Sequence, residues 1–491
     1  MTTALILLPL TAGLIVGLAP LERRMTEGLA LLAALVECAL GVVALIQFDA
    51  DKGTQFVTDK VWITDFLGIA DVRFHVGMGG LSLFMVLLTA VGVAAAAATA
   101  SWVGRERPRV YFALLLGLEC ALVLLFTARD IVLFYVGWEA MMIPLYVLIA
   151  VWGGEQRRRA TLTFFIYTLI GSLLMLVAVA WVGIHGNSFQ IDVLTGAGLD
   201  STWPFLAFCA AFCIKAPLFP LHGWLPITYR QAAPETTALL SGVISKAGAY
   251  GLITIAIPLF APNAVDLRWW FVGLALAGLL YGSLIAFRQP DARGVVAYSS
   301  LGQMNLIVIG IFASLPSTLH VIGGLSVPAG AANDNGITGA KFQMVNHGLV
   351  SLAAFLLISL IELRCGTDAF KYLGGLANGR PVISTVFLIT ALFALAVPGS
   401  AVFVSELYIL IGAFQFQALV GAAAACTIVL AAMYMLRWYS ALVHEGDGPN
   451  VSPETPDLRL GELGIAVPLV LILLVLSAYP FGVMERLGGF G

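Results

Sequence analysis

Charged residues are scarce in this chain of 491 residues. Asp, Glu, Lys and Arg together make up 11% of it, against roughly a quarter in soluble domains. Hydrophobic residues make up 60%, and the mean hydropathy is +0.97. This composition predicts an integral membrane protein with no sizeable soluble domain. The formal net charge of −3 offers none of the basic excess that is typical of nucleic-acid binding.

Cofactor-binding motifs are also missing. The six cysteines form no CxxC pair, so neither an iron–sulfur cluster nor a disulfide framework is indicated. No GxGxxG follows a strand and no GxxxxGK[ST] occurs, so no nucleotide cradle is predicted. Cys209 and Cys213, one helical turn apart, are interpreted as small apolar packing residues. We therefore expect no cofactor and no metal in this chain.

Long apolar runs take up most of the sequence. A membrane-spanning helix needs about 20 apolar residues, and the chain holds about fourteen such runs joined by short loops. The prediction is an all-α polytopic membrane protein, with residues 1–491 forming a single transmembrane domain. The first run has no basic start and no cleavage site, so we expect it to be retained and not removed as a signal peptide. The predicted spans lie near residues 3–20, 25–46, 78–102, 110–127, 131–151, 161–183, 204–229, 235–260, 269–287, 294–313, 343–363, 382–414, 417–440 and 462–482.

Lysine and arginine are distributed unequally between alternate loops. Loops after odd-numbered spans hold 16 of the 25 positive residues, and loops after even-numbered spans hold 6. Because short cytoplasmic loops collect positive charge, the odd-numbered loops are predicted to be cytoplasmic. Fourteen spans then place both termini on the non-cytoplasmic side.

Two predicted spans are interrupted by proline. Lys215 is closely followed by two prolines, and Pro398 lies shortly before Glu406. Proline removes a helical hydrogen bond, and irregular backbone at membrane depth survives only where it is buried in protein or lines a hydrated cavity. Interrupted spans in matching places are typical of inverted-repeat transporters. We therefore predict two inverted five-helix repeats, about 110–260 and about 269–440, with broken helices 7 and 12 and flanking helices within 3–102 and 462–482.

Four ionisable residues lie at apparent membrane depth: Glu139, Lys215, Lys246 and Glu406. Such a charge costs roughly 2.5 to 3.5 kcal/mol on insertion scales and usually marks an ion pathway. Glu139 and Lys215, if adjacent, would titrate as a coupled pair, and a desolvated lysine can lose its proton. The alternatives are an inert ion pair, lysines that snorkel to the membrane surface, and a helix-dipole partner role for Glu406.

Three further residues are candidates for a supporting role. His222 and His347 titrate near neutral pH and could carry protons, although a packing role fits them equally well. Glu119 in the fourth span could assist the relay, and Glu37 in the second faces either lipid or a neighbouring subunit. The Gly-rich stretch 315–341 is predicted to be a structural, non-cytoplasmic loop.

Several sequence runs resemble the antiporter-like subunits of respiratory complex I, and subunit M most closely. They are ARDIVLFYVGWEAMMIPLYVLIAVWGG, KAPLFPLHGWLPITYRQAAPETTALLSGVISKAGAYGL, AYSSLGQMNLIVIGIF, FQMVNHGLVSLAAFLLI and VPGSAVFVSELYILIGAF. The resemblance covers the chain from about residue 77 onward. It implies a fourteen-helix subunit that moves protons, with Glu139 and Lys215 as its glutamate–lysine pair, Lys246 as the connecting lysine and Glu406 as the terminal acid. Glutamate at this last position resembles subunit M, whereas subunits L and N and related cation/proton antiporter subunits usually carry lysine there.

The resemblance also implies the setting of the chain. NADH, FMN, iron–sulfur clusters and quinone would belong to partner subunits of an NADH:quinone oxidoreductase in the bacterial inner membrane, with subunits L and N as neighbours. The chain would be a non-redox, proton-pumping part of this translocase, embedded in the lipid bilayer. The alternatives are a subunit of a multi-subunit sodium/proton antiporter or of a membrane-bound hydrogenase-type complex, and a structural scaffold with inert ion pairs.

The sequence departs from the family pattern in three places. The family commonly has SHMG in helix 10, where this chain has Gly302-Gln303-Met304-Asn305. Gln303 cannot titrate, so a histidine relay is not expected at that point. The turn at 77–80 lacks the acid that the family has there, and the loop before Lys341 is longer than usual.

Overall fold

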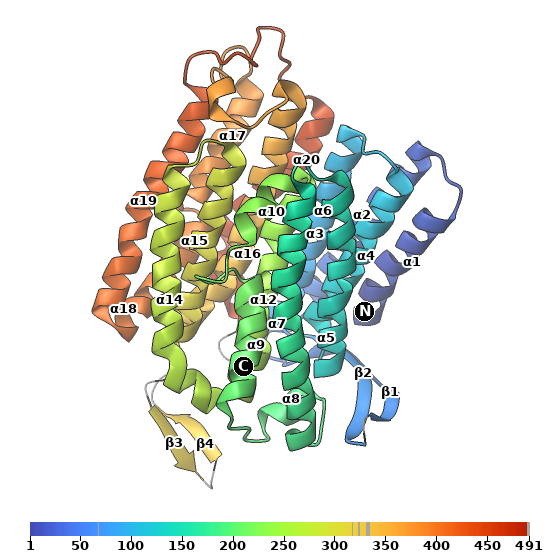
Figure 1. The fold of residues 1–491 in the computed structure, drawn as a ribbon, viewed down its shortest axis with the longest axis vertical. Coiled ribbons are helices and arrows are strands. Elements are labelled where there is room, and N and C mark those ends of the chain that lie inside the picture. Colours follow the sequence, from blue (N-terminus) through green and yellow to red (C-terminus); the bar gives the residue numbers. More distant parts are fainter. Residues whose placement is uncertain (67, 317, 323–324, 330–333, 489–491) are drawn as a thin grey trace.

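The fourteen predicted membrane passes are confirmed in a computed structural model, which describes residues 1–66, 68–316, 318–322, 325–329 and 334–488. The long helices stand side by side along the longest axis of the molecule (Figure 1). Eleven of the helical segments in these ranges are long and apolar enough to cross a membrane, and shorter helices make the other passes. The passes are α1 (Thr2–Leu18), α2 (Arg23–Gln47), α3 (Gly80–Val103), α4 (Pro108–Thr127), α5 with α6 (Ile131–Ala140 and Met142–Trp152), α7 (Arg157–Gly186), α9 with α10 (Thr202–Lys215 and Leu225–Gln231), α11 to α13 (Pro234–Leu259), α14 (Ala261–Phe287), α15 (Ala292–Ala313), α16 (Asp334–Cys365), α17 with α18 (Pro381–Ala394 and Ala401–Phe416), α19 (Ala418–Val443) and α20 (Leu460–Ala478).

Both predicted interruptions are present. In the seventh pass α9 ends at Lys215 and α10 begins at Leu225, and in the twelfth α17 ends at Ala394 and α18 begins at Ala401. Prolines lie within both irregular stretches, and each proline removes a backbone donor that a continuous helix would need. Lys215 therefore closes a half-helix, and Glu406 lies in the second turn of another.

The fifth pass contains a break that the sequence analysis did not predict. Met141 separates α5 from α6, and Pro144 lies in the first turn of α6. A proline ring clashes with the carbonyl four residues earlier, here that of Ala140. Asp130 fixes the other end of α5, because its side chain accepts hydrogen bonds from two backbone N–H groups of the first turn at 2.9 and 3.2 Å. The break places Glu139 next to the junction of two helices.

The eighth pass is not a uniform α-helix either. Two π-helical turns flank α12, the short helix that carries Lys246. Such turns shift the faces of a helix relative to one another and often occur at functional sites. The order along the pass is α11 (Pro234–Leu239), a π-turn at Leu240–Ile244, α12 (Ser245–Gly251), a π-turn at Leu252–Ala256 and α13 (Ile257–Leu259).

The predicted limits of the loop at 315–341 are wrong. The helix α16 begins at Asp334, about two turns before the predicted start of its span. These first turns are polar, so hydropathy did not mark them as part of a span. An acid at the N-terminus of a helix, here Asp334, interacts favourably with the helix dipole. Lys341, which was assigned to the loop, is buried inside α16 and donates to the backbone carbonyl of Gly488 at 2.9 Å.

Two antiparallel hairpins lie outside the helical bundle, at the same end of the molecule (Figure 1). They occupy loops after even-numbered spans, and the loop that joins α19 to α20 lies at the opposite end. The alternation of loops between two ends agrees with the predicted topology. The strands are β1 (Gln55–Phe66) with β2 (Ala70–Met78), and β3 (Thr318–Ile322) with β4 (Leu325–Ala329).

Candidate proton-transfer site

Lys215 is fully buried at the end of α9. Its ammonium nitrogen lies 3.1 Å from the Met142 sulfur. It also lies 5.3 Å from the ring centre of Trp138 and 5.2 Å from that of Phe164. A thioether and two ring faces are weak partners for an ammonium group. Among the described residues, the ammonium group of Lys215 therefore has only weak partners, which a stronger hydrogen-bond acceptor could replace.

Glu139 faces Lys215 without touching it. The two helices meet through Trp138 of α5 and Phe212 of α9, whose ring centres are 5.4 Å apart. Among the described residues no ion pair within 4.0 Å joins Glu139 and Lys215. One carboxyl oxygen of Glu139 is buried without a hydrogen-bond partner in the described part of the chain. The two groups thus form a separated pair.

Lys246 is fully buried and has well-defined partners. Its ammonium nitrogen lies 2.9 Å from His347 Nδ1, 2.5 Å from the Ser241 carbonyl oxygen and 3.3 Å from Ser245 Oγ. On the other side of the imidazole, His347 Nε2 lies 3.1 Å from Ser351 Oγ. Because a histidine can accept a proton at one ring nitrogen and release another from the second, this arrangement can pass a proton from α12 to α16.

The two lysines are brought together by close packing of α9 against α12. A Cβ atom on Gly248 would lie 2.3 Å from the Phe212 carbonyl oxygen and 2.6 Å from the Ala216 nitrogen. Only glycine permits this approach. The packing therefore holds the helix of Lys246 directly against the residues around Lys215.

Glu406 lies in a network of amide side chains. Gln303 donates to one carboxyl oxygen of Glu406 at 2.8 Å. Gln343 donates to the Gln303 side-chain oxygen at 2.8 Å, and Ser405 donates to the Gln343 side-chain oxygen at 2.5 Å. The expected departure at Gln303 thus has a structural role, since this amide is the direct donor to Glu406. Gln343 gave no signal in the sequence, because a neutral amide stands out neither by charge nor by hydropathy.

A small cavity separates the histidine group from the amide group. Its volume is about 20 Å³, and its lining includes His347 and Ser351 on one side and Gln303 and Gln343 on the other. A cavity of this size and polarity has room for one water molecule. A second cavity of about 10 Å³ is lined by Gln303 and Glu406. The two groups are therefore within reach of each other across one water position.

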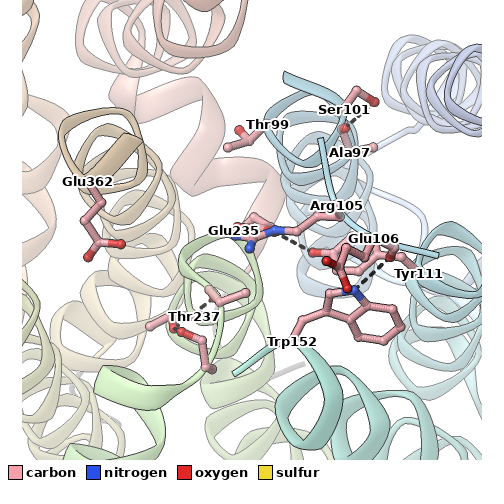
Figure 2. A network of polar contacts seen from close by, with 12 residues as sticks. Ala97, Thr99, Ser101, Arg105, Glu106, Tyr111, Trp152, Glu235, Thr237 and Glu362 are labelled. Carbon is pink, nitrogen blue, oxygen red and sulfur yellow. Dashed lines mark hydrogen bonds and ion pairs between the residues drawn. The ribbon is translucent and has the colours of Figure 1, made fainter. Parts of the chain in front are cut away.

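A polar network lies at the end of the same helices that the loop charges predict to be cytoplasmic. Arg105 donates to both carboxyl oxygens of the fully buried Glu235, at 2.6 and 2.9 Å, and the Tyr111 hydroxyl donates to the first of them at 2.8 Å (Figure 2). Burial alone would lower the pKa of Arg105, but the charge and hydrogen bonds of Glu235 raise it above its usual value. The Trp152 ring nitrogen donates to the Glu106 carbonyl at 2.9 Å (Figure 2).

A wide cavity of about 740 Å³ opens beside this network. Its lining includes Arg293, which forms a two-point ion pair with Glu362, and Asp368. Burial raises the pKa of Asp368, and the positive charge of Arg293 partly offsets this rise. In the sequence these arginines indicated only the side on which their loops lie. Their acidic partners gave no recognisable signal in the sequence.

Only one of the three supporting candidates bonds to the four charged residues. His347 binds Lys246, as described above. His222 lies in the irregular stretch after α9 and packs its ring 5.1 Å from that of Tyr281, with one nitrogen unpartnered among the described residues. Glu119 makes no hydrogen bond within the described part of the chain. Glu37 is fully buried between helices of this chain, so the prediction that it faces lipid or a neighbouring subunit is wrong.

The comparisons with known proteins agree with one another. The family described as NADH:quinone oxidoreductase/Mrp antiporter, TM, matches residues 128–431. NADH-quinone oxidoreductase subunit M of Rhodobacter capsulatus is 33% identical over 98% of this chain and 93% of its own. NADH-ubiquinone oxidoreductase chain 4 of Marchantia polymorpha is 32% identical over 97% of this chain and 93% of its own. A chain of respiratory complex I from Thermus thermophilus with bound NADH has a TM-score of 0.87 at 29% identity and covers 100% of both chains. This chain belongs to the NADH:quinone oxidoreductase and Mrp antiporter family, in the group that is called subunit M or chain 4.

Proposed function

We propose that this chain translocates protons across the bacterial inner membrane as an antiporter-like subunit of an NADH:quinone oxidoreductase. The observation that supports it most is a line of polar groups through the centre of the bundle, in which Lys215, Lys246, His347 and Glu406 are buried. It runs from the separated pair Glu139 and Lys215, through Lys246 and His347, to Glu406. Charged groups at membrane depth are expensive unless they are functional.

The proposed path starts at the cytoplasmic end. Protons reach Glu139 and Lys215 from the side of the wide cavity. When the distance between these two groups increases, the positive charge on Lys215 loses its electrostatic support and the proton moves toward Lys246. His347 accepts it at Nδ1 and releases a proton from Nε2. A water molecule in the cavity of about 20 Å³ carries it to the amide group around Glu406, from which it leaves.

The redox chemistry belongs to partner subunits in this proposal. Among the described residues no group of three or more His, Cys, Asp or Glu side chains is placed to hold a metal ion. NADH, FMN, iron–sulfur clusters and quinone are bound elsewhere in the complex, and subunits L and N are the neighbours of this chain in the membrane. Quinone reduction drives translocation by changing the separation of Glu139 and Lys215.

The rival is a subunit of a sodium/proton antiporter that works without redox coupling. Glu406 favours the oxidoreductase, since the resemblance associates lysine at this position with the antiporter subunits. Purification from native membranes separates the two proposals. Copurifying NADH-oxidising, quinone-reducing activity supports the oxidoreductase, and its absence from an intact, proton-transporting complex supports the antiporter.

Substitution of Lys215 tests the path. In inverted membrane vesicles that contain the Lys215→Met complex, NADH-driven acidification should fall on the order of tenfold or more, because a proton-transfer group is lost. The exposed Lys371 gives a matched control, since Lys371→Met removes a lysine that lies far from the line and contacts the Tyr372 ring. A Lys215→Met complex that assembles and pumps at the full proton-per-NADH ratio would contradict the proposal.

A further inference from the structure

Two buried carboxyl groups lie outside the line from Glu139 to Glu406. They are Glu37 of α2 and Glu119 of α4, each near the middle of its helix. Each begins the same four residues, Glu-Cys-Ala-Leu, at 37–40 and at 119–122. Neither residue falls in the segment 128–431 that matches the family. The family match therefore assigns them no role.

The surroundings of this pair are apolar. The helices α2 and α4 pack against each other, and both pack against α1 and α3, which carry no ionisable side chain. Glu37 and Glu119 have no exposed surface, and none of their four carboxyl oxygens has a hydrogen-bond partner among the described residues. Each side chain thus lies unpartnered in the protein interior, on one of two helices that pack against each other.

The other titratable groups near the pair do not neutralise it. The Cys38 and Cys120 thiols are the groups next to the two acids in sequence, and thiols carry no positive charge. The other elements packed against α4 carry Asp71, Arg73 and His75 on β2, Tyr135 and Glu139 on α5, Tyr146 on α6, and Lys246 and Tyr250 on α12. None of these has a described hydrogen bond to either acid.

We infer that Glu37 and Glu119 form a proton-binding pair in which at least one carboxyl group keeps its proton. A single buried carboxylate without a partner is costly, and two on helices that pack against each other repel each other as well. A proton on one of them removes one charge from the apolar interior. This site does not depend on the proposed function, because it lies on different helices from the line through Lys246.

A lipophilic carbodiimide tests this inference on the assembled complex in its membrane. N,N′-dicyclohexylcarbodiimide adds to a protonated carboxyl group in an apolar environment and leaves a stable N-acylurea, which mass spectrometry of α2 and α4 peptides detects. We expect an adduct on Glu37 or Glu119 at neutral pH. Glu235 is the internal control: it is equally buried, but Arg105 donates to both of its carboxyl oxygens, and it should remain unmodified.

Single substitutions distinguish a coupled pair from two independent acids. In Glu119→Gln at alkaline pH, labelling of Glu37 should fall by roughly fivefold or more relative to the unsubstituted chain, because the neighbouring negative charge that retains the proton is gone. Glu37→Gln should do the same for Glu119. Both changes preserve side-chain size, and native electrophoresis checks assembly. Unmodified Glu37 and Glu119 in recovered peptides, or labelling of one that does not respond to loss of the other, would overturn the inference.

Discussion

In the proposed path, His347 is the side chain that connects Lys246 to the group around Glu406. Lys246 has one titratable neighbour among its hydrogen-bond partners, and that neighbour is His347. The imidazole in turn reaches the cavity that borders the Glu406 group. Without a group that can both accept and release a proton here, the lysine and the glutamate would remain separate.

Replacement of His347 should interrupt the transfer. His347→Gln keeps hydrogen-bonding capacity but cannot titrate, so NADH-driven acidification of inverted vesicles should fall by roughly tenfold or more. His222→Gln is the matched control, because His222 packs beside Tyr281 and bonds to none of the four charged residues. Equal loss in both variants would show that the position of His347 next to Lys246 is irrelevant.

The sequence predicted charged site residues better than neutral ones. Glu139, Lys215, Lys246 and Glu406 stand out because a charge in an apolar run carries a large energetic cost. Gln343 and Ser405 belong to the hydrogen-bonded network around Glu406, yet polar uncharged residues are common enough in spans to give no such signal. The separation of Glu139 from Lys215 was also beyond sequence reasoning, since it depends on how two helices pack.

At the scale of elements, glycine contacts determine how closely the half-helices approach. Gly248 of α12 lies against the end of α9, where a Cβ atom would overlap backbone atoms of Phe212 and Ala216. Backbone atoms cannot move aside as a flexible side chain can. The short helices that carry the two lysines are thus fixed to each other at one point.

Gly248→Ala should therefore destabilise the protein. Overpacking typically costs about 1–3 kcal/mol, so the thermal unfolding midpoint of the purified complex should fall, and proton pumping with it. Gly273→Ala in α14 is the control, because a Cβ atom there meets nothing within 4 Å. In a helix interior this exchange should even stabilise slightly. An unchanged unfolding midpoint in Gly248→Ala would contradict the packing described here.

Proline made the two interrupted passes predictable, whereas the π-turns around Lys246 were not. A proline has a fixed local effect, but a π-turn depends on the packing of a whole helix against its neighbours. The two hairpins were missed for a related reason. Their strands lie outside the bilayer, where no long apolar run marks them.

At the scale of the whole molecule, hydropathy and loop charge predicted the number and direction of the passes. Helix length in a bilayer is set by membrane thickness, so the count needs no knowledge of packing. The family match and the structural match over the full chain agree with it. The helix faces that meet in the centre are determined by how the side chains pack, and only the structure shows them.

The direction of the chain in the membrane can be measured. A cysteine at Lys52 should react with a membrane-impermeant maleimide from the non-cytoplasmic side, and one at Arg158 only from the cytoplasmic side. Both positions are exposed, and the exposed Cys426 is first replaced by Ala. Labelling of intact spheroplasts and of inverted vesicles should give opposite patterns. The same pattern for both positions would contradict the predicted topology.

Because of the break at Met141, α5 is a short, separate helix whose other end is bonded to the β1–β2 hairpin. This helix has 10 residues, or about 15 Å of length. Its outer end is attached to the β1–β2 hairpin, because Asp130 accepts from the Arg73 backbone N–H at 3.0 Å and Arg129 donates to the His75 carbonyl at 2.8 Å. Its inner end carries Glu139, while Lys215 belongs to a different helix. The hairpin and Glu139 are therefore linked through a single short helix, which ends at the break and does not continue into α6.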